Sequence, residues 1–268
     1  MTLPQANPPA AYIGGKRNLA RRLCALIETI PHHSYIEPFV GMGGVFLRRA
    51  RPAPAEVIND LSGDVANLFR VVRRHYEPFV AELAFLPASR DEFDRQLRLD
   101  PEALTDIERA VRFLYLQRLC FGGRVTGRTF GVRKTQSSRI QLARLRAELR
   151  ALSRRLEPVT IERLPWGEAV RRYDDPRALF YLDPPYDETE GYGTEFGRAD
   201  YLAMAEQLGA IAGQFVLSIN DTAFVRDAFA RFSIEEVDTT WSLGARGGAT
   251  KRAAELIIRS RPPATGPD

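Results

Sequence analysis

The chain has 268 residues, of which 44% are hydrophobic and 27% charged, a composition typical of a globular protein with one large domain, or with a domain and a smaller insertion. No apolar stretch approaches the roughly 20 residues of a membrane helix. The first residues have neither a basic nor an apolar region, so we expect no secretory signal. The formal net charge is +4 and the two cysteines have no disulfide or metal spacing, so we expect a cytoplasmic protein with buried free thiols, no metal and no membrane partner.

The first part of the chain alternates between helix and strand patterns. Apolar residues at helical spacing predict a helix over 18–30. Short apolar runs predict buried strands over 34–39 and 55–60, and VGMGGVFLRRA between them indicates a tight glycine turn that opens a helix. A further helix is expected over 62–75, with Ser62 as its N-cap. This order is typical of the start of a doubly wound parallel sheet.

The middle of the chain has a different pattern, with helical spacing and no strong strand. Helices are predicted over 91–98, 106–121 and 139–156, and a polar, basic, glycine-rich loop over 122–138. We interpret residues 77–157 as a helical insertion into an α/β domain that is made of residues 1–76 and 158–268.

Strand and helix patterns alternate again after the insertion. Strands are expected over 158–164, 178–183, 214–220, 233–241 and 252–260, and helices over 166–173, 198–212 and 221–232. The last two strands read as a closing pair. The fold class that follows is α/β, with a Rossmann-like sheet.

The charge is unevenly distributed along the chain. The segment from Arg118 to Arg155 holds eleven basic residues and one acid, Glu148, so it carries +10 while the rest of the chain carries −6. Such asymmetry indicates a polyanion partner, and we favour nucleic acid over the alternative of an arginine-rich, solvated helix.

The first candidate site is the glycine loop EPFVGMGG at 37–44. Gly41 and Gly43 permit positive φ and a close approach of the backbone to a ligand. Asp60 ends the next strand, at the offset where an acid meets a ribose hydroxyl in dinucleotide folds. Phe46 stands where a pyrophosphate-binding loop would need glycine, which favours a smaller cofactor that bears adenosine.

The second candidate site is YLDPPY, where a buried strand ends in a carboxylate and two prolines. Ligands of open α/β sheets bind at the carboxyl ends of the strands, so Asp183 is expected at that rim. Pro184 and Pro185 fix the backbone and direct carbonyl oxygens outward, and Tyr186 offers a flat face. Two acceptors and a stacking surface suit the amine of a planar base. The alternative is a plain turn with Tyr186 as packing.

The motifs YIGGK at 12–16, EPFVGMGG at 37–44 and DPPY at 183–186 occur in an order that resembles the Dam-like (D12 class) DNA adenine N6-methyltransferases. LSIND at 217–221 resembles a later strand motif of that family, and the likeness extends over roughly 12–259. The resemblance implies an S-adenosylmethionine-dependent methyltransferase sheet with a helical target-recognition insertion. The cofactor-binding residues that it implies are Tyr12, Lys16, Phe39, Gly41, Gly43, Asp60 and Asp183.

The resemblance also implies a reaction at the N6 amine of adenine in double-stranded DNA. The lone pair of N6 is delocalised into the ring, and hydrogen bonds to the Asp183 carboxylate and the Pro184 carbonyl would expose it for in-line attack on the sulfonium methyl group. The base must leave the duplex to reach this pocket, and Tyr186 is its expected stacking partner. No Pro-Cys nucleophile motif is present, which disfavours methylation of cytosine C5.

The insertion departs from the family pattern. Many relatives carry aromatic-Asn-Gly where this chain has Phe121-Gly122-Gly123, so recognition of the sequence GATC is not implied. Phe121 is expected either to wedge between bases or to pack in the core. The candidate DNA-binding residues are Arg118, Phe121, Arg124, Arg128, Arg133 and Lys134.

Several alternatives remain open at this point. The substrate could be RNA, or the N4 amine of cytosine, although N4 enzymes more often have serine in place of Asp183. A catalytically silent DNA-binding module on the same fold is a second alternative, and a nicotinamide dehydrogenase is a third and weaker one. The sequence favours a monomer, and does not separate a host epigenetic enzyme from a phage or restriction-modification enzyme.

Overall fold

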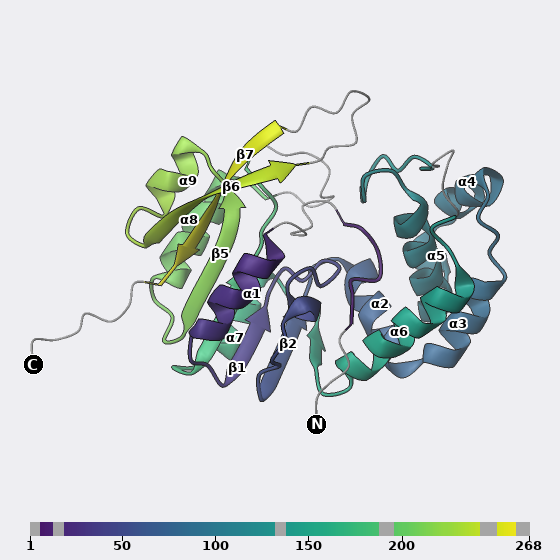
Figure 1. Ribbon diagram of the computed structural model, residues 1–268, viewed down its shortest axis with the longest axis horizontal. Coiled ribbons are helices and arrows are strands. Elements are labelled where there is room, and N and C mark those ends of the chain that lie inside the picture. The colour runs from purple at the N-terminus through teal and green to yellow at the C-terminus, as the bar shows by residue number, and fades with distance from the viewer. Residues whose placement is uncertain (1–5, 13–18, 132–137, 188–195, 242–250, 261–268) are drawn as a thin grey trace, which may run out of the picture.

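The computed structural model describes residues 6–12, 19–131, 138–187, 196–241 and 251–260, and leaves the side chains of 238–241 and 251–253 outside the description. Within these ranges the protein has a mixed α/β fold built on a seven-stranded sheet with the order β3-β2-β1-β4-β5-β7-β6 (Figure 1). The strands are β1 (Ser34–Glu37), β2 (Ala55–Asn59), β3 (Thr160–Glu162), β4 (Ala178–Leu182), β5 (Gln214–Asn220), β6 (Ser233–Trp241) and β7 (Lys251–Arg259). The α/β fold predicted from the sequence is confirmed.

The order of the strands creates a switch point at the carboxyl ends of β1 and β4, here called the crevice after the ligand crevice of open α/β sheets. The chain leaves β1 for β2 on one side and later returns to β4 on the other, and both neighbours run parallel to β1. Ligands of open α/β sheets bind at such a switch point, because no connecting segment crosses the strand ends there. β4 is buried at every position, as expected for a central parallel strand.

Side chains that alternate along the strands bury both faces of the sheet. Tyr35, Tyr181 and Val216 face one apolar cluster, together with α1 (Ala20–Thr29) and α2 (Gly63–Arg74). Phe180 and Leu217 face the other cluster, with α7, α8 and α9. These three helices span Trp166–Tyr173, Arg198–Leu208 and Ala223–Ala228.

In its described residues the predicted insertion forms four α-helices and a 3-10 turn, η2 (Pro101–Ala103), and the α-helices stand beside the sheet in Figure 1. They are α3 (Tyr76–Ala84), α4 (Arg90–Arg98), α5 (Asp106–Leu119) and α6 (Leu142–Leu156). The apolar cluster under α1 and α2 continues through Phe79, Phe113 and Leu149 of these helices without a break. The helices 77–157 therefore share a core with the sheet, although their division from it as a functional domain stays a prediction.

One expected helix is much shorter than the pattern indicated. The glycine turn opens only a single 3-10 turn, η1 (Phe46–Arg48), because Pro52 and Pro54 follow closely and require extended backbone before β2. The predicted cap of α2 is confirmed, since the Ser62 hydroxyl accepts a hydrogen bond from the Val65 N–H at 3.4 Å. The described helices include none that is both long and apolar enough to cross a bilayer.

Candidate functional site

Polar side chains gather where the parallel strands end. Glu37 is the last residue of β1, Asn59 and Asp60 end β2, Asp183 follows β4, and Asn220 ends β5. Because β1, β2, β4 and β5 are parallel, these residues share one edge of the sheet. The crevice predicted from the sequence is therefore rich in carboxyl and amide groups.

Gly41 brings three predicted cofactor residues together. Its φ is +49°, a region that favours glycine, and its N–H donates to Asp60 Oδ2 at 2.9 Å. The other Asp60 oxygen accepts from the Ser62 N–H at 2.9 Å, at the start of α2. A Cβ on Gly41 would lie 3.1 Å from the ring of Tyr12, so this ring packs directly on the loop.

Burial raises the pKa of Asp60 to about 6, while the N–H donors of Ser62 and Gly41 oppose the rise. Each Asp60 oxygen has a second lone pair, so two backbone donors leave acceptor capacity for a further hydroxyl group.

Gly43 and Phe39 have a packing role in addition to the one predicted. Gly43 has φ +73°, and a Cβ there would lie 2.9 Å from the side chain of Leu47. The half-buried Phe39 ring lies 6.5 Å from the Trp166 ring and 5.9 Å from the Phe196 ring, between centroids. These three aromatic rings pack against the apolar cluster under α7–α9, next to the carboxyl end of β1.

Asn59 fixes the exit of β1, a contact that the sequence analysis missed. Its side-chain N–H₂ donates to the carbonyl oxygens of Pro38 at 2.9 Å and Leu164 at 3.0 Å, and its oxygen accepts from the Leu164 N–H at 2.8 Å. The side chain is almost fully buried and makes three good hydrogen bonds, so it holds the strand ends at a fixed spacing.

Glu37 is a second missed residue, although it lies in the motif that drew attention to the loop. It is 2% exposed, and the Tyr35 hydroxyl donates to its Oε2 at 2.8 Å. Burial is the main cause that raises the pKa of Glu37 to about 8, with a smaller contribution from the nearby charge of Asp183 and against the hydrogen bond from Tyr35. The raised pKa favours the protonated form of Glu37. The signal for it was an acid inside an otherwise apolar strand.

The Asp-Pro-Pro-Tyr segment is clamped by residues from α8 and β5. The Tyr201 hydroxyl donates to the Pro185 carbonyl. Asn220 pairs with the backbone of Asp187, whose N–H donates to Asn220 Oδ1 at 3.0 Å and whose carbonyl accepts from Asn220 Nδ2 at 2.9 Å. The Thr222 hydroxyl adds a bond to the Asp187 carboxylate at 3.1 Å. The clamp fixes the backbone on both sides of Tyr186.

Tyr186 is 7% exposed and belongs to the apolar cluster under α7–α9. Pro184 is buried beside it, and Asp183 is half-buried at the end of β4. Most of the Tyr186 ring therefore packs in the protein interior, which agrees with the packing alternative. Its role as a stacking partner for a base stays a prediction.

The predicted DNA-binding residues differ in their surroundings. Arg118 donates to the carbonyl oxygens of Pro9 at 2.6 Å and Arg139 at 3.2 Å, and to Glu148 at 2.6 Å. These contacts give Arg118 a structural role in addition to any contact with DNA. Phe121 is 48% exposed, so it does not pack in the core.

Arg124 and Arg128 lie in the same turn and differ in exposure. The Arg124 side chain is exposed. Arg128 is half-buried, donates to the Arg124 carbonyl and to Gln117, and has a pKa lowered by burial. Lys16, Arg133 and Lys134 lie outside the described residues.

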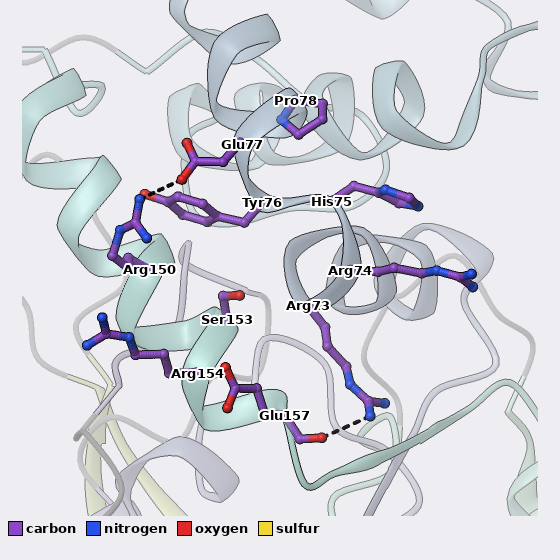
Figure 2. Close-up of a pocket in the computed structure, with 10 residues that line it drawn as sticks. All are labelled: Arg73, Arg74, His75, Tyr76, Glu77, Pro78, Arg150, Ser153, Arg154 and Glu157. Atoms are coloured by element: carbon purple, nitrogen blue, oxygen red, sulfur yellow. Dashed lines mark hydrogen bonds and ion pairs between the residues drawn. The ribbon is translucent and has the colours of Figure 1, made fainter.

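A basic hollow of about 500 Å³ lies elsewhere on the molecule, at the carboxyl end of α2 (Figure 2). Arg73, Arg74, Arg150 and Arg154 line it, with Arg150 paired to Glu77 at 2.7 Å. Since α2 has twelve residues and rises about 1.5 Å per residue, this hollow is about 18 Å along the helix from the Asp60 end. It is thus separate from the crevice.

The described residues contain no group of three histidine, cysteine or carboxylate side chains that could hold a metal ion. Cys24 and Cys120 are free and buried, as expected, and burial raises the pKa of Cys24 to about 11.

Comparisons with known proteins agree with the family resemblance that the motifs indicate. Residues 12–243 match the family model of the D12 class N6 adenine-specific DNA methyltransferase. The chain is 25% identical to the DNA adenine methylase of Escherichia coli K12, over 90% of this chain and 93% of that protein. It is 27% identical to the DNA adenine methylase of Haemophilus influenzae, with coverage of 93% and 92%. It is 24% identical to the type II methyltransferase M1.LlaDCHI of Lactococcus lactis, with 94% of each chain covered.

Proposed function

The chain belongs to the D12 class of N6 adenine-specific DNA methyltransferases, and from this premise we propose that it transfers a methyl group from S-adenosylmethionine to adenine N6 at a short, specific site in duplex DNA. The observation that carries the proposal is the placement of Asp183 and the glycine loop at the ends of the adjacent strands β4 and β1. A methyl donor on the loop and an amine at Asp183 would meet in the crevice between these strands.

The residues of the crevice fit the proposed cofactor. The absence of a side chain on Gly41 lets the Tyr12 ring pack directly on the loop, where it would cover a bound cofactor, and Asp60 keeps acceptor capacity for ribose hydroxyls. Lys16, Phe39 and Gly43 complete the binding set that the family resemblance implies. When bound, S-adenosylmethionine supplies an electrophilic methyl group on a positively charged sulfur.

Asp183 and the Pro184 carbonyl are the proposed acceptors for the two N6 protons of adenine. Their hydrogen bonds would draw the nitrogen towards a tetrahedral shape and expose its lone pair for in-line attack on the sulfonium methyl group, so that the N–C bond would form as the C–S bond breaks and the thioether leaves. The extra proton on the methylated nitrogen then passes to the Asp183 carboxylate. The clamp from Tyr201 and Asn220 supports this proposal, because preorganised acceptors lower the barrier without rearrangement during the reaction.

We propose that the insertion binds DNA and that the adenine leaves the duplex to enter the crevice. The 48% exposure of Phe121 supports a role as a wedge that fills the vacated stack, and the exposed Arg124 is suited to a phosphate or a base edge. The flipped base would contact the exposed part of Tyr186. Arg133 and Lys134 belong to the same proposed surface.

Replacing Asp183 with alanine tests the mechanism. Asp183→Ala should lower the rate of methyl transfer at least about a hundredfold, the effect expected for loss of a preorganised group at the reacting centre. DNA affinity should stay within about threefold of wild type, because the insertion is intact. Transfer of radioactive methyl groups to duplex DNA, and a filter-binding titration, measure the two quantities.

Asp221→Ala is the matched control, since Asp221 also follows a parallel strand but pairs with Arg226 at 2.6 Å. Its methyl transfer should remain close to wild type. Normal turnover by Asp183→Ala would show that the mechanism is wrong.

The substrate is best identified by modification-sensitive sequencing of DNA from cells that express the protein. N6-methyladenine at one recurring short sequence is the expected result. N4-methylcytosine in its place, or methyl transfer to RNA but not to duplex DNA in a parallel assay, would refute the proposed substrate.

A further inference from the structure

Residues 6–12, here called the N-terminal strap, are held by the last turn of α5. Gln117 is fully buried, and its Nε2 donates to the Ala11 carbonyl at 2.9 Å and to the Gly123 carbonyl at 2.6 Å. Its Oε1 accepts from Arg128 at 3.2 Å. One amide group thus joins the strap, the turn after α5 and an arginine of the insertion.

Gly123 brings the turn into direct contact with the strap. Its φ is +70°, and a Cβ there would lie 2.9 Å from the Tyr12 nitrogen and 3.0 Å from the Ala11 carbonyl carbon. Real Cβ atoms do not approach backbone atoms so closely. The two backbones therefore pack with no space between them, so neither can move toward the other, and the Gln117 amide holds them together.

The strap reaches the glycine loop through the side chain of the same residue, Tyr12, whose backbone meets Gly123. The Tyr12 ring lies against Gly41, 3.1 Å from the position that a Cβ would take. Gly41 in turn donates to Asp60. Contacts therefore run without a break from the turn 121–130, through Gln117 and the strap, to the loop at the end of β1.

We propose that Gln117 and Gly123 are positioning residues that make DNA binding and cofactor binding cooperative, by tying the position of Tyr12 to that of the turn 121–130. The proposal rests on the proposed function, in which the turn meets DNA and the glycine loop meets the cofactor. A turn that is fixed by DNA fixes the strap, and hence the ring that covers the loop. Linkage makes the effect reciprocal, so each ligand strengthens the binding of the other by one common factor.

The experiment measures that factor directly. The dissociation constant of sinefungin, a cofactor analogue that cannot transfer a methyl group, is determined by calorimetry with and without a saturating duplex that the wild-type enzyme methylates. The ratio of the two constants is the coupling factor, and we expect it to exceed about fivefold in the wild type, within the usual range for coupled sites. A change in stability alone would not alter this ratio.

Two neighbouring glycines provide a matched pair of variants. Gly122 has φ +73° and Gly123 has φ +70°, so alanine adds the same backbone strain at either position. A Cβ on Gly122 meets nothing closer than an Arg124 side-chain carbon at 4.0 Å, whereas a Cβ on Gly123 meets the strap. Gly123→Ala should therefore lower the coupling factor below about twofold, while Gly122→Ala should keep the wild-type value.

Gln117→Met tests the amide by a second route, because it keeps the volume of the side chain and removes its hydrogen bonds. Its coupling factor should also fall below about twofold. The single-turnover rate at saturation of both ligands should stay within about threefold of wild type, since Gln117 touches no reacting group.

The outcomes separate this inference from the proposed function. A wild-type enzyme that methylates DNA with a coupling factor of about 1 would overturn the inference alone. Equal losses in Gly122→Ala and Gly123→Ala would also overturn it, as would unchanged coupling in Gln117→Met. A wild-type enzyme that binds sinefungin but methylates no DNA would refute the proposed function itself.

Discussion

Glu37 lies beside Asp183 in a buried setting where two negative charges are costly. The pKa of Glu37 rises from 4.5 to about 8 on folding, mainly through burial. Between these pH values the folded protein holds a proton that the unfolded chain releases, so the free energy of unfolding falls as the pH rises. The contribution is fully present below pH 4.5 and is lost as the pH approaches 8.

Glu37→Gln should remove this pH dependence, because glutamine carries no titrating proton. From pH 5 to pH 8 the variant should gain stability relative to wild type, by up to about 1.4 kcal/mol for each pH unit. Urea unfolding of both proteins at three pH values within this window measures the difference. Parallel stability profiles would contradict the assignment of the raised pKa.

The residues of the motifs were easier to predict than the residues that hold them. Asp60 and Asp183 follow apolar runs, and the rule that parallel strands end at one edge places both in the crevice. Asn59, Asn220 and Gln117 give no such local signal, because each acts through a partner 20 to more than 100 positions away in the chain. Their roles emerge only when distant segments are placed in space.

Helix α6 is fastened to the sheet by a buried ionic cluster, which consists of Arg49, Glu56 and Arg155. Arg155 pairs with Glu56 at 2.6 Å and Arg49 pairs with it at 2.8 Å, and all three side chains are at most 4% exposed. The guanidinium groups also lie over the rings of Phe46 and Tyr35, at 4.1 and 3.7 Å from the ring centres. Glu56 thus supplies the one negative charge that two nearly fully buried arginines share.

Glu56→Gln should destabilise the protein by about 3–5 kcal/mol, since it leaves two buried guanidinium groups without a counter-charge. Glu148→Gln is the matched control. Glu148 also pairs with two arginines, at 2.6 and 2.8 Å, but its side chain is 24% exposed and one partner, Arg144, is 77% exposed. The control should cost about 1 kcal/mol or less. Chemical denaturation measures both variants, and equal costs would contradict the argument from burial.

The elements themselves were largely predictable from apolar periodicity. Strong alternation and helical spacing located β5, β6 and α7 with the bounds that the structure has. The helix predicted after the glycine turn is wrong for a local reason. Pro52 and Pro54 stop a helix that the apolar spacing alone would allow. Helix α3 was not separated from its surroundings, because its neighbours are also helical and only His75 lies between it and α2.

Across the whole molecule, fewer arginines of the segment 118–155 are available to bind DNA than the sequence suggested. Arg118, Arg139 and Arg155 use their donors on carbonyl groups or a buried acid. Among the described residues of this segment, Arg124, Arg146 and Arg154 are exposed and take part in no ion pair. Of these, Arg124 belongs to the turn that we propose meets DNA.

Arg124→Ala should weaken DNA binding and reduce its salt dependence. Each lost phosphate contact lowers the slope of log affinity against log salt concentration by about 0.9. Arg74→Ala removes another exposed arginine, from the basic hollow (Figure 2) away from the crevice, and should leave the slope unchanged. Titrations of a labelled duplex at several salt concentrations provide the slopes. A larger change of slope in Arg74→Ala than in Arg124→Ala would indicate that DNA binds at the basic hollow, and would contradict the proposed role of the turn 121–130.

The uninterrupted apolar cluster beneath α1, α2 and α3–α6 has a consequence for attempts to exchange target specificity between related enzymes. A chimaera that swaps the whole of 77–157 would set foreign side chains against α2 and mismatch the shared core. Grafting only the turn 121–130 would leave that core intact, provided that the donor sequence keeps glycine at position 123 and an aromatic residue in place of Phe130, which packs against the cluster. If the turn meets DNA as we propose, the practical unit of exchange is this turn, and not the helical segment that carries it.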